Sequence, residues 1–316
     1  MTLPFKKVLV TGGAGFIGSH LTEALVTEEC QVTVLDNLSS GDLSNLNSVK
    51  NRVSFCKGDI RDLRTVEDSA RGREAIFHLA AMVSVPQTVA QPIESAQIND
   101  LGTLHIFEAA RRNNVERVVF TSSSAVYGDD PRLPKQEEMN PEPLSPYAVQ
   151  KLSGEYYARV FNMLYGMKAT SLRLFNVFGP RQDPSSSYSG VISIFMSQAV
   201  SKSPATIYGD GNQSRDFIFV KDVVRANLLA AAVDHAAGKS INVGTGRSVS
   251  INRLWDVVCQ KADLTMAAQY ESPRSGDILE SVADIRRAKS VLGFEPQYSF
   301  EKGIDQTFEW YRRKRK

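Results

Sequence analysis

A glycine-rich segment near the N-terminus constrains the fold of this 316-residue chain more than any other feature. The segment from Gly12 to Gly18 reads GGAGFIG and directly follows the apolar run Val8–Val10. Gly12 suits a tight turn, Gly15 lets the backbone approach a pyrophosphate, and Gly18 lets the following helix pack closely on the strand. Because a helix N-terminus attracts anions, the segment predicts a strand, a turn and a helix that bind a dinucleotide.

An acidic residue further along the chain supports this prediction. A second apolar run, Val32–Leu35, ends at Asp36, which lies 18 residues after Gly18. A carboxylate at the tip of the second strand accepts hydrogen bonds from an adenosine ribose and repels a 2′-phosphate. The pattern therefore favours NAD over NADP as the cofactor.

The first half of the chain alternates apolar runs with helical or polar stretches. This alternation predicts an α/β fold with a doubly wound parallel Rossmann sheet. The pattern changes after Phe178-Gly179-Pro180, which predicts a smaller α/β C-terminal substrate domain. We expect residues 1–178 to bind NAD, residues 216–245 to return to that domain, and residues 179–215 and 246–316 to bind the substrate. The runs expected to form strands are Val8–Val10, Val32–Leu35, Val53–Phe55, Ile76–Leu79, Val118–Phe120, Thr170–Leu174, Phe217–Val220 and Ile241–Val243.

Composition excludes several classes of function. The net charge of +2 is too small to indicate a nucleic acid or a membrane surface as partner. Cys30, Cys56 and Cys259 are far apart and indicate no disulfide framework, so a reducing cytoplasm is expected. The four histidines have no metal-ligand spacing, so no metal is expected, and His78 is interpreted as a buried core residue.

Tyr147 and Lys151 are the candidate catalytic pair. They are four residues apart, after Pro146, which suits the first turn of a helix, so both side chains share one helix face. A nearby ammonium and a cationic nicotinamide ring both favour phenolate, so we expect a lowered tyrosine pKa and a general base for a hydroxyl proton. Ser123, with Ser124 as the alternative, supplies a hydroxyl that can share this proton.

With these motifs, the chain resembles the extended short-chain dehydrogenase/reductase superfamily, and within it the nucleotide-sugar 4-epimerases of the NAD-dependent epimerase/dehydratase family. The resemblance spans essentially the whole chain. It includes His78-Leu79-Ala80-Ala81, Ala125-Val126-Tyr127-Gly128, Arg173-Leu174-Phe175-Asn176 and Ser214-Arg215-Asp216-Phe217. It implies bound NAD, a UDP-sugar substrate and a homodimer.

The resemblance also implies a role for individual residues. Counting back four residues from Tyr127 selects Ser123 as the catalytic hydroxyl beside Tyr147 and Lys151. The residues implied to bind NAD are Gly12, Gly15, Phe16, Ile17, Gly18, Asp36, Asn37, Asp59, Ile60, Leu79, Ala80, Ala81, Asn99, Thr121, Tyr147, Lys151 and Phe175. Those implied to bind the substrate are Ser84, Ser123, Ser124, Tyr147, Asn176, Val191, Tyr208, Arg215, Arg274, Asp277 and Ser281.

Several positions narrow the implied activity. Dehydratases of the superfamily carry an Asp-Glu pair where Ser124 and Ala125 stand, and the decarboxylases usually carry a glutamate at Ala125. Ser281 matches a position at which a bulky tyrosine restricts the pocket to glucose and galactose, whereas a serine leaves room for an N-acetyl group. Glucose-type enzymes often carry a lysine where Val83 stands. The expected function is therefore 4-epimerisation of a UDP-hexose, with UDP-N-acetylglucosamine and UDP-N-acetylgalactosamine favoured over UDP-glucose and UDP-galactose.

Other functions on the same scaffold stay open as alternatives. They are epimerisation, dehydration or decarboxylation of another nucleotide sugar and, outside catalysis, NAD-dependent regulation. The homodimer has support from the helix after Tyr147, which is apolar around much of its circumference and carries Tyr156, Val160 and Leu164. The alternative is that the second domain covers this face.

Overall fold

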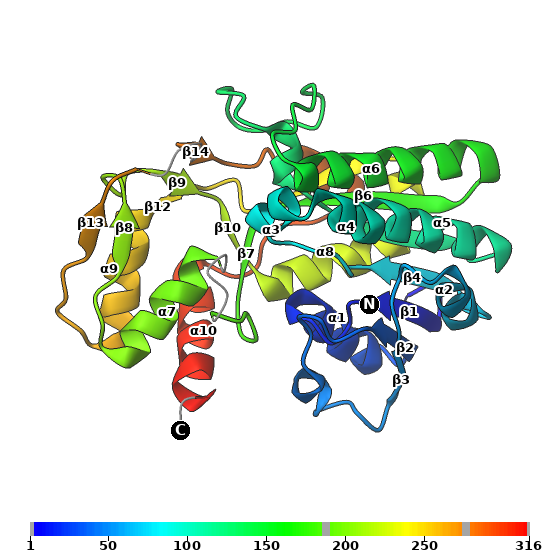
Figure 1. The fold of residues 1–316 in the computed structure, drawn as a ribbon, viewed down its shortest axis with the longest axis horizontal. Helices are drawn as coiled ribbons and strands as arrows, with labels where there is room; N and C mark the ends of the chain where they lie inside the picture. The colour runs from blue at the N-terminus through cyan, green and yellow to red at the C-terminus, as the bar shows by residue number, and fades with distance from the viewer. Residues whose placement is uncertain (1–2, 185–189, 274–278, 315–316) are drawn as a thin grey trace.

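The computed structural model describes residues 3–184, 190–273 and 279–314, which form a larger and a smaller lobe (Figure 1). The larger lobe contains a seven-stranded sheet in which neighbouring strands are parallel, in the order β11-β6-β5-β4-β1-β2-β3. Its strands are β1 (Lys7–Thr11), β2 (Gln31–Asp36), β3 (Val53–Lys57), β4 (Ala75–His78), β5 (Arg117–Ser123), β6 (Lys168–Leu174) and β11 (Ser240–Val243).

Helices cover both faces of this sheet, as the alternating pattern predicts. On one face, α1 (Phe16–Thr27) and α8 (Val220–Ala232) enclose an apolar core with the sheet. On the other, a second core lies under α2 (Leu63–Ala70), α5 (Gly102–Arg112) and α6 (Pro146–Tyr165). The doubly wound α/β fold is therefore confirmed, and the strand order reverses between β1 and β4, where ligands of such sheets bind.

Short elements link the strands and helices of the larger lobe. The segment between β4 and α5 forms three consecutive helical pieces, and η3 follows β5 directly. These elements are η1 (Leu43–Leu46), α3 (Val85–Ala90), α4 (Pro92–Ala96), the π-helical turn η2 (Gln97–Leu101), η3 (Ser124–Tyr127) and η4 (Asp234–Ala236).

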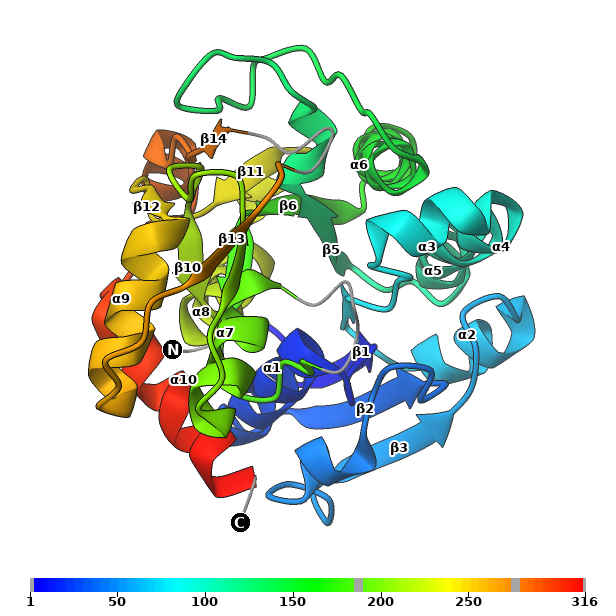
Figure 2. The same cartoon turned by 60° about the vertical axis from the view of Figure 1, so that its left-hand side comes forward.

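The smaller lobe has its own apolar core, which includes an edge-to-face contact between Phe195 and Trp255 at 5.3 Å between ring centroids. Its sheets have two or three short strands, paired β10-β7, β12-β9-β14 and β13-β8. Figure 2 shows β10, β12, β13 and β14 on the same side of the molecule as α7, α9 and α10. The remaining elements are β7 (Asn176–Phe178), α7 (Val191–Ser201), β8 (Thr206–Tyr208), β9 (Ser214–Arg215), β10 (Phe217–Phe219), β12 (Val249–Ser250), α9 (Ile251–Ala262), β13 (Gln269–Glu271), β14 (Glu280–Ser281), η5 (Ala288–Leu292) and α10 (Phe300–Lys314).

The segment after Asp216 differs in part from the sequence prediction. β11 adds an edge strand to the large sheet, beside β6. The expected strand Phe217–Val220, in contrast, ends at Phe219, because Val220 begins α8, and this strand pairs with β7 outside the large sheet. An apolar run of four residues does not reveal which of its residues already belong to the next helix.

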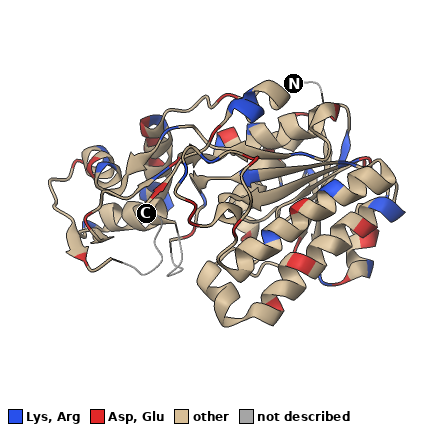
Figure 3. Ribbon diagram, turned by 90° about the horizontal axis from the view of Figure 1, so that it is seen from above, with Lys and Arg blue, Asp and Glu red and all other residues tan. Residues whose placement is uncertain are grey.

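The surface and the helices of the described ranges add three observations. No helix within residues 3–184, 190–273 and 279–314 is long and apolar enough to cross a membrane. Acidic and basic residues are interspersed over the larger lobe (Figure 3). In the same residues, no group of three or more histidine, cysteine, aspartate or glutamate side chains is arranged to hold a metal ion.

Candidate active site

The glycine-rich turn connects β1 to α1 at the point where the strand order reverses. Gly12 has a φ of +69°, and a Cβ atom there would lie 2.8 Å from the Ala80 nitrogen, after β4. A Cβ atom at Gly18 would lie 2.8 Å from the Gly12 carbonyl carbon. Both positions therefore require glycine. Gly15 is the N-cap of α1 and supplies no side-chain cap, so a ligand can meet the first-turn N–H groups of Phe16 and Ile17.

Asp36 lies at the carboxyl end of β2, beside this turn. Its side chain is buried, with Oδ2 accepting from the Ala14 N–H at 2.9 Å and Oδ1 from the Leu38 N–H at 2.8 Å. These bonds hold the carboxylate at the edge of the glycine turn. The neighbouring Asn37 side chain donates to Asp59 Oδ2 at 3.0 Å, which brings the ends of β2 and β3 together.

Asp59 is an anion held by a neighbouring guanidinium. Hydrogen bonds from Arg61 lower the pKa of Asp59 to about 2. Ile60, the next residue, is buried under α5 and a Cβ atom at Gly102 would lie 2.8 Å from its Cδ1. The predicted adenosine-side residues thus share the carboxyl edge of β2 and β3.

Lys151 projects from α6 toward β5. Ser145 caps the helix by accepting from the Ala148 N–H at 3.2 Å, and Pro146 occupies its first turn, as predicted from the sequence. The buried Lys151 ammonium donates to the Thr121 carbonyl oxygen at 2.7 Å, and burial lowers the lysine pKa to about 8. Its Nζ lies 5.8 Å from the centroid of the Tyr147 ring.

Tyr147 forms a hydrogen bond with the side chain of Ser123, at the end of β5. The Ser123 hydroxyl also accepts from the Ala125 N–H at 3.2 Å, whereas Ser124 begins η3. The structure therefore brings Ser123, Tyr147 and Lys151 together at one strand end. This geometry favours Ser123 over Ser124 as the hydroxyl beside the phenol.

The low tyrosine pKa expected beside an ammonium and a cationic nicotinamide ring stays a prediction, and the burial of the phenol acts against it. Burial raises the pKa of Tyr147 above its ordinary value of 10, and the hydrogen bond from Ser123 opposes that rise only in part. The sequence placed an ammonium one helical turn away. It could not reveal that both groups are buried and that the ammonium bonds to a carbonyl oxygen of β5.

Asn99 connects the cofactor side of the site to α6. It lies in the π-helical turn η2 and is buried, and its amide bonds to both the N–H and the carbonyl oxygen of Met82. The same amide donates to Gln150 Oε1 at 2.8 Å, and Gln150 in turn donates to Ser95. Gln150, which the sequence analysis did not single out, thereby joins η2 to the helix that carries Lys151.

Leu79, Ala80 and Ala81 follow β4, and the first two N–H groups of this segment lie 3.3 Å from Thr11 Oγ1. The same hydroxyl bonds His78 Nδ1 at 2.7 Å, and His78 Nε2 lies 3.0 Å from Thr103 Oγ1. His78 is therefore the buried, hydrogen-bonded core residue that the sequence predicted, and burial lowers its pKa to about 3.

Three predicted substrate residues lie on neighbouring short strands. Phe175 donates from its N–H to the Val243 carbonyl oxygen, and Asn176 then begins β7. Arg215 and Ser281 are register partners in the parallel pair β9–β14, and Ser281 is buried. Asn176, Arg215 and Ser281 thus converge, as the Asn176 and Ser281 backbones both bond to Asp216.

The other predicted substrate residues are more dispersed. Ser84 caps α3 by accepting from the Gln87 N–H, and Ser124 begins η3. Val191 begins α7 and Tyr208 ends β8, both in the smaller lobe (Figure 1). Arg274 and Asp277 lie outside the described residues.

A buried ion pair behind the site escaped the sequence analysis. Glu155 on α6 bonds Arg173 on β6 at 2.7 Å, with both side chains at most 5% exposed. The Glu155 carboxylate also accepts from Ser122 at 2.5 Å and from Ser240 at 2.8 Å, so it ties α6 to three strands. The available signal was Glu155 itself, an acidic residue one helical turn after Lys151 and therefore on the same face of α6.

The fold and the groups at its strand ends define a Rossmann-type dinucleotide-binding protein. The model of the NAD-dependent epimerase/dehydratase family matches residues 8–244, and the chain belongs to this family. A UDP-glucose 4-epimerase of Mycolicibacterium smegmatis is 40% identical over 312 residues, covering 98% of this chain and 99% of the relative.

Solved structures agree closely with this fold. The UDP-N-acetylglucosamine 4-epimerase of Methanobrevibacter ruminantium M1, in complex with UDP-N-acetylmuramic acid, has a TM-score of 0.94 and 42% identity, covering 98% of this chain and 99% of its own. The UDP-glucose 4-epimerase of Thermotoga maritima, with UDP-glucose, has a TM-score of 0.93 and 38% identity, covering 98% and 100%.

The cofactor is NAD, and the residues present fit it. The glycine turn offers a pyrophosphate a helix N-terminus without an obstructing side chain, and the Asp36 carboxylate lies beside it. Within the described residues, the buried Thr121 Oγ1 has no hydrogen-bond partner, although its own carbonyl oxygen holds Lys151. This hydroxyl can therefore bond a polar group of the cofactor.

Proposed function

We propose that this protein catalyses the reversible inversion of C4 in a UDP-hexose, with UDP-N-acetylglucosamine and UDP-N-acetylgalactosamine as the substrate pair. The observation that carries the proposal is the meeting of Ser123, Tyr147 and Lys151 at the end of β5. UDP-glucose and UDP-galactose are the alternative pair, which the M. smegmatis and T. maritima relatives name.

Each of the three residues has a distinct task in the proposed reaction. Tyr147 removes the proton from the sugar 4-hydroxyl, and Ser123 donates a hydrogen bond to the same oxygen as it becomes a carbonyl. Lys151 holds the nicotinamide ribose and, with the cationic ring, opposes the effect of burial on the tyrosine pKa. Bound NAD supplies the oxidation and the later reduction of C4. Tyr147 then returns the proton to O4 after the 4-keto sugar has presented its other face.

The UDP moiety stays in place while the sugar turns. Guanidinium forks suit phosphate oxygens, so Arg215 and Arg274 are assigned to the diphosphate, with Asn176 and Asp277 beside it. Tyr208 is assigned to the uracil side. In domain terms, residues 1–178 with 216–245 hold NAD, and residues 179–215 with 246–316 hold the nucleotide sugar.

The choice of the N-acetylated sugars rests on Ser281. A serine at this buried position occupies much less space than a tyrosine would, which favours a sugar with a bulky substituent at C2. The name of the M. ruminantium relative supports the same pair. Incubation with each UDP-sugar and separation of the products tests this choice, because preferred conversion of UDP-glucose would refute it.

The Tyr147→Phe variant tests the assignment of the base. The phenol oxygen is the only group removed, so we expect turnover to fall at least about a thousandfold while the NAD content of the purified chain stays unchanged. Turnover near the wild-type level would refute the assignment. If the wild-type chain binds NAD but converts no nucleotide sugar, the catalytic proposal fails. That result would instead support the alternative of NAD-dependent regulation without catalysis.

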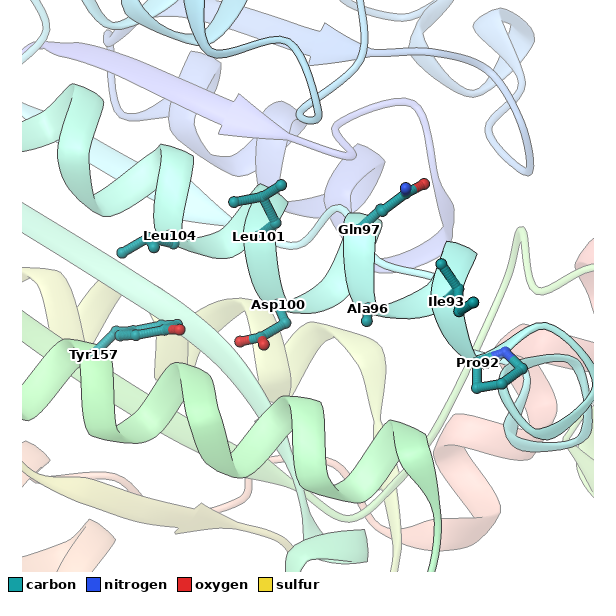
Figure 4. A pocket seen from close by; sticks show the side chains of 8 residues that line it. All are labelled: Pro92, Ile93, Ala96, Gln97, Asp100, Leu101, Leu104 and Tyr157. Atoms are coloured by element: carbon teal, nitrogen blue, oxygen red, sulfur yellow. The ribbon is translucent and has the colours of Figure 1, made fainter.

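We further propose that two copies of this chain form a homodimer through α4, η2, α5 and α6. On α6, the exposed side chains of Tyr156, Val160 and Met163 follow helical spacing and are 54%, 42% and 70% exposed. The alternative in which the smaller lobe covers this face is wrong for the described residues. A pocket of about 450 Å³ lies beside α4 and η2 (Figure 4), and Tyr157 of α6 also lines it. Its lining residues are Pro92, Ile93, Ala96, Gln97, Asp100, Leu101, Leu104 and Tyr157.

Met163→Glu tests the dimer. A charge within an apolar helix pairing is strongly unfavourable, so sedimentation should give a monomer mass for the variant and a dimer mass for the wild type. Leu43→Glu, which changes another exposed leucine-sized side chain on η1, is the matched control and should sediment as the wild type does. A wild-type monomer at micromolar concentration would contradict the proposal.

A further inference from the structure

The carboxylate of Asp216 joins three segments that are far apart in the sequence. Its side chain is fully buried, between β9 and β10. Oδ1 accepts from the Thr245 N–H at 2.8 Å and from the Thr245 hydroxyl at 2.6 Å. Oδ2 accepts from the Gly246 N–H at 2.9 Å and from the Ala283 N–H at 3.1 Å. One side chain therefore fixes the loop after β11 and the segment after β14.

The main chain of Asp216 makes two further connections. Its N–H donates to the Ser281 carbonyl oxygen at 2.8 Å, and its carbonyl oxygen accepts from the Asn176 N–H at 3.0 Å. Arg215 precedes it directly. Three residues assigned above to the substrate are thus attached to Asp216 by a covalent bond or by a backbone hydrogen bond.

The surroundings of this carboxylate leave it little room to move. A Cβ atom at Gly244 would lie 2.7 Å from Asp216 Oδ2 and 2.6 Å from Ala283 Cβ, so only glycine allows these segments to approach as they do. The carboxylate is the acceptor in all four hydrogen bonds, so the four donors around it need acceptor atoms in fixed positions. A carboxylate meets this demand with two oxygens and no proton of its own.

We propose that Asp216 is a positioning residue, which sets Arg215, Asn176 and Ser281 in the arrangement that binds the nucleoside diphosphate and the sugar. The inference rests on the proposed function, which assigns these three residues to the substrate. Asp216 itself does not touch the reacting carbon. Its contribution is to the place of the binding groups, so its loss should affect substrate affinity rather than the chemical step.

Asp216→Asn is the direct test, because it preserves shape but turns an amide group toward N–H donors. We expect the affinity for UDP, measured by calorimetry, to fall at least about tenfold, and KM for the UDP-sugar to rise by a similar factor. The value of kcat should stay within about threefold of wild type, and the NAD content should not change, because α6 and the glycine turn are untouched.

Asp222→Asn is the matched control. Asp222 is also buried and accepts from two backbone N–H groups, those of Gln297 at 2.9 Å and Tyr298 at 3.1 Å, but it lies on α8. A general loss of stability should appear in both variants as a lower Tm. The loss of UDP affinity should appear only in Asp216→Asn, and equal losses in both variants would overturn the inference.

Thr245→Val covers the case in which Asp216→Asn does not fold. This variant removes only the hydroxyl that donates to Asp216 Oδ1, so we expect a smaller fall in UDP affinity in the same direction. UDP affinity within about twofold of wild type for every folded variant would overturn the inference. A wild-type chain that binds UDP but converts no UDP-sugar would refute the proposed function alone, since the UDP measurements would still decide the role of Asp216.

Discussion

Replacing Gly154 with alanine should displace the helix that carries Tyr147 and Lys151. An added Cβ atom would lie 2.5 Å from Phe120 Cε1, whereas carbon atoms in contact are about 3.5–4.0 Å apart. Either the Phe120 ring or α6 must therefore move by about 1 Å. Phe120 cannot easily give way, because it is 1% exposed and packs against the rings of His78 and Phe107. The yielding element is α6.

The expected cost differs for stability and for activity. Overpacking of this kind costs about 1–3 kcal/mol, and the better helix propensity of alanine returns roughly 1 kcal/mol. The net loss of unfolding free energy is therefore small, about 0–2 kcal/mol. A displacement of about 1 Å at catalytic groups, in contrast, costs on the order of a hundredfold in rate. The 2.7 Å bond from Lys151 to the Thr121 carbonyl oxygen should break or lengthen.

Turnover of the UDP-sugar and unfolding in urea separate these two effects. Gly166→Ala is the matched control at the other end of the same helix, where φ is +68° and nothing lies within 4 Å of the added Cβ atom. It should cost about 1–2 kcal/mol of stability without loss of turnover. If Gly154→Ala retained turnover within about threefold of wild type, the reasoning that the α6–β5 distance sets the catalytic geometry would be refuted.

Two further predictions concern buried charge. Glu155→Gln leaves Arg173 charged and without its carboxylate, so the free energy of unfolding, measured in urea, should fall by about 3–5 kcal/mol. The control variant Glu108→Gln, which breaks a more exposed ion pair, should lose about 0–1 kcal/mol. A loss below about 1 kcal/mol for Glu155→Gln would contradict the role of the buried pair. Burial lowers the His78 pKa from 6.5 to about 3, so below pH 6.5 the unfolded chain takes up a proton that the folded chain refuses. Stability should therefore fall by about 2 kcal/mol more in wild type than in His78→Gln between about pH 7 and pH 5, and parallel falls in urea titrations would contradict this.

The parts of the fold that the sequence predicted have local causes. Gly12 must adopt a positive φ and Gly18 must meet the backbone of Gly12, so the motif reports its own conformation. Ser145 and Pro146 likewise specify the first turn of α6 through their own bonding and ring geometry. From these signals the βαβ unit and the common face of Tyr147 and Lys151 could be predicted.

The parts that escaped prediction depend on partners far away in the sequence. The bond between Asn99 and Gln150 spans 51 residues, and that between Asp216 and Ala283 spans 67. The raised pKa of Tyr147 depends on burial, which a spacing of four residues does not reveal. A motif can identify which side chains share a helix face. Whether these side chains are buried, however, depends on how the helices cover the whole sheet.

An epimerase must hold one part of its substrate still while another part turns, and the two parts need separate supports. In this chain the groups assigned to chemistry stand on β5 and α6, which the Glu155 carboxylate ties together through Ser122 and Arg173. The groups assigned to the nucleotide stand on β7, β9 and β14, which Asp216 ties together. The two groups of strands meet between Arg173 and Asn176, where β6 of the large sheet passes into β7, and at β11, where Ser240 bonds Glu155 and the following loop bonds Asp216. Because a different buried carboxylate holds each group of strands, a change on the nucleotide side should alter affinity without moving the phenol, whereas a change under α6 should do the opposite.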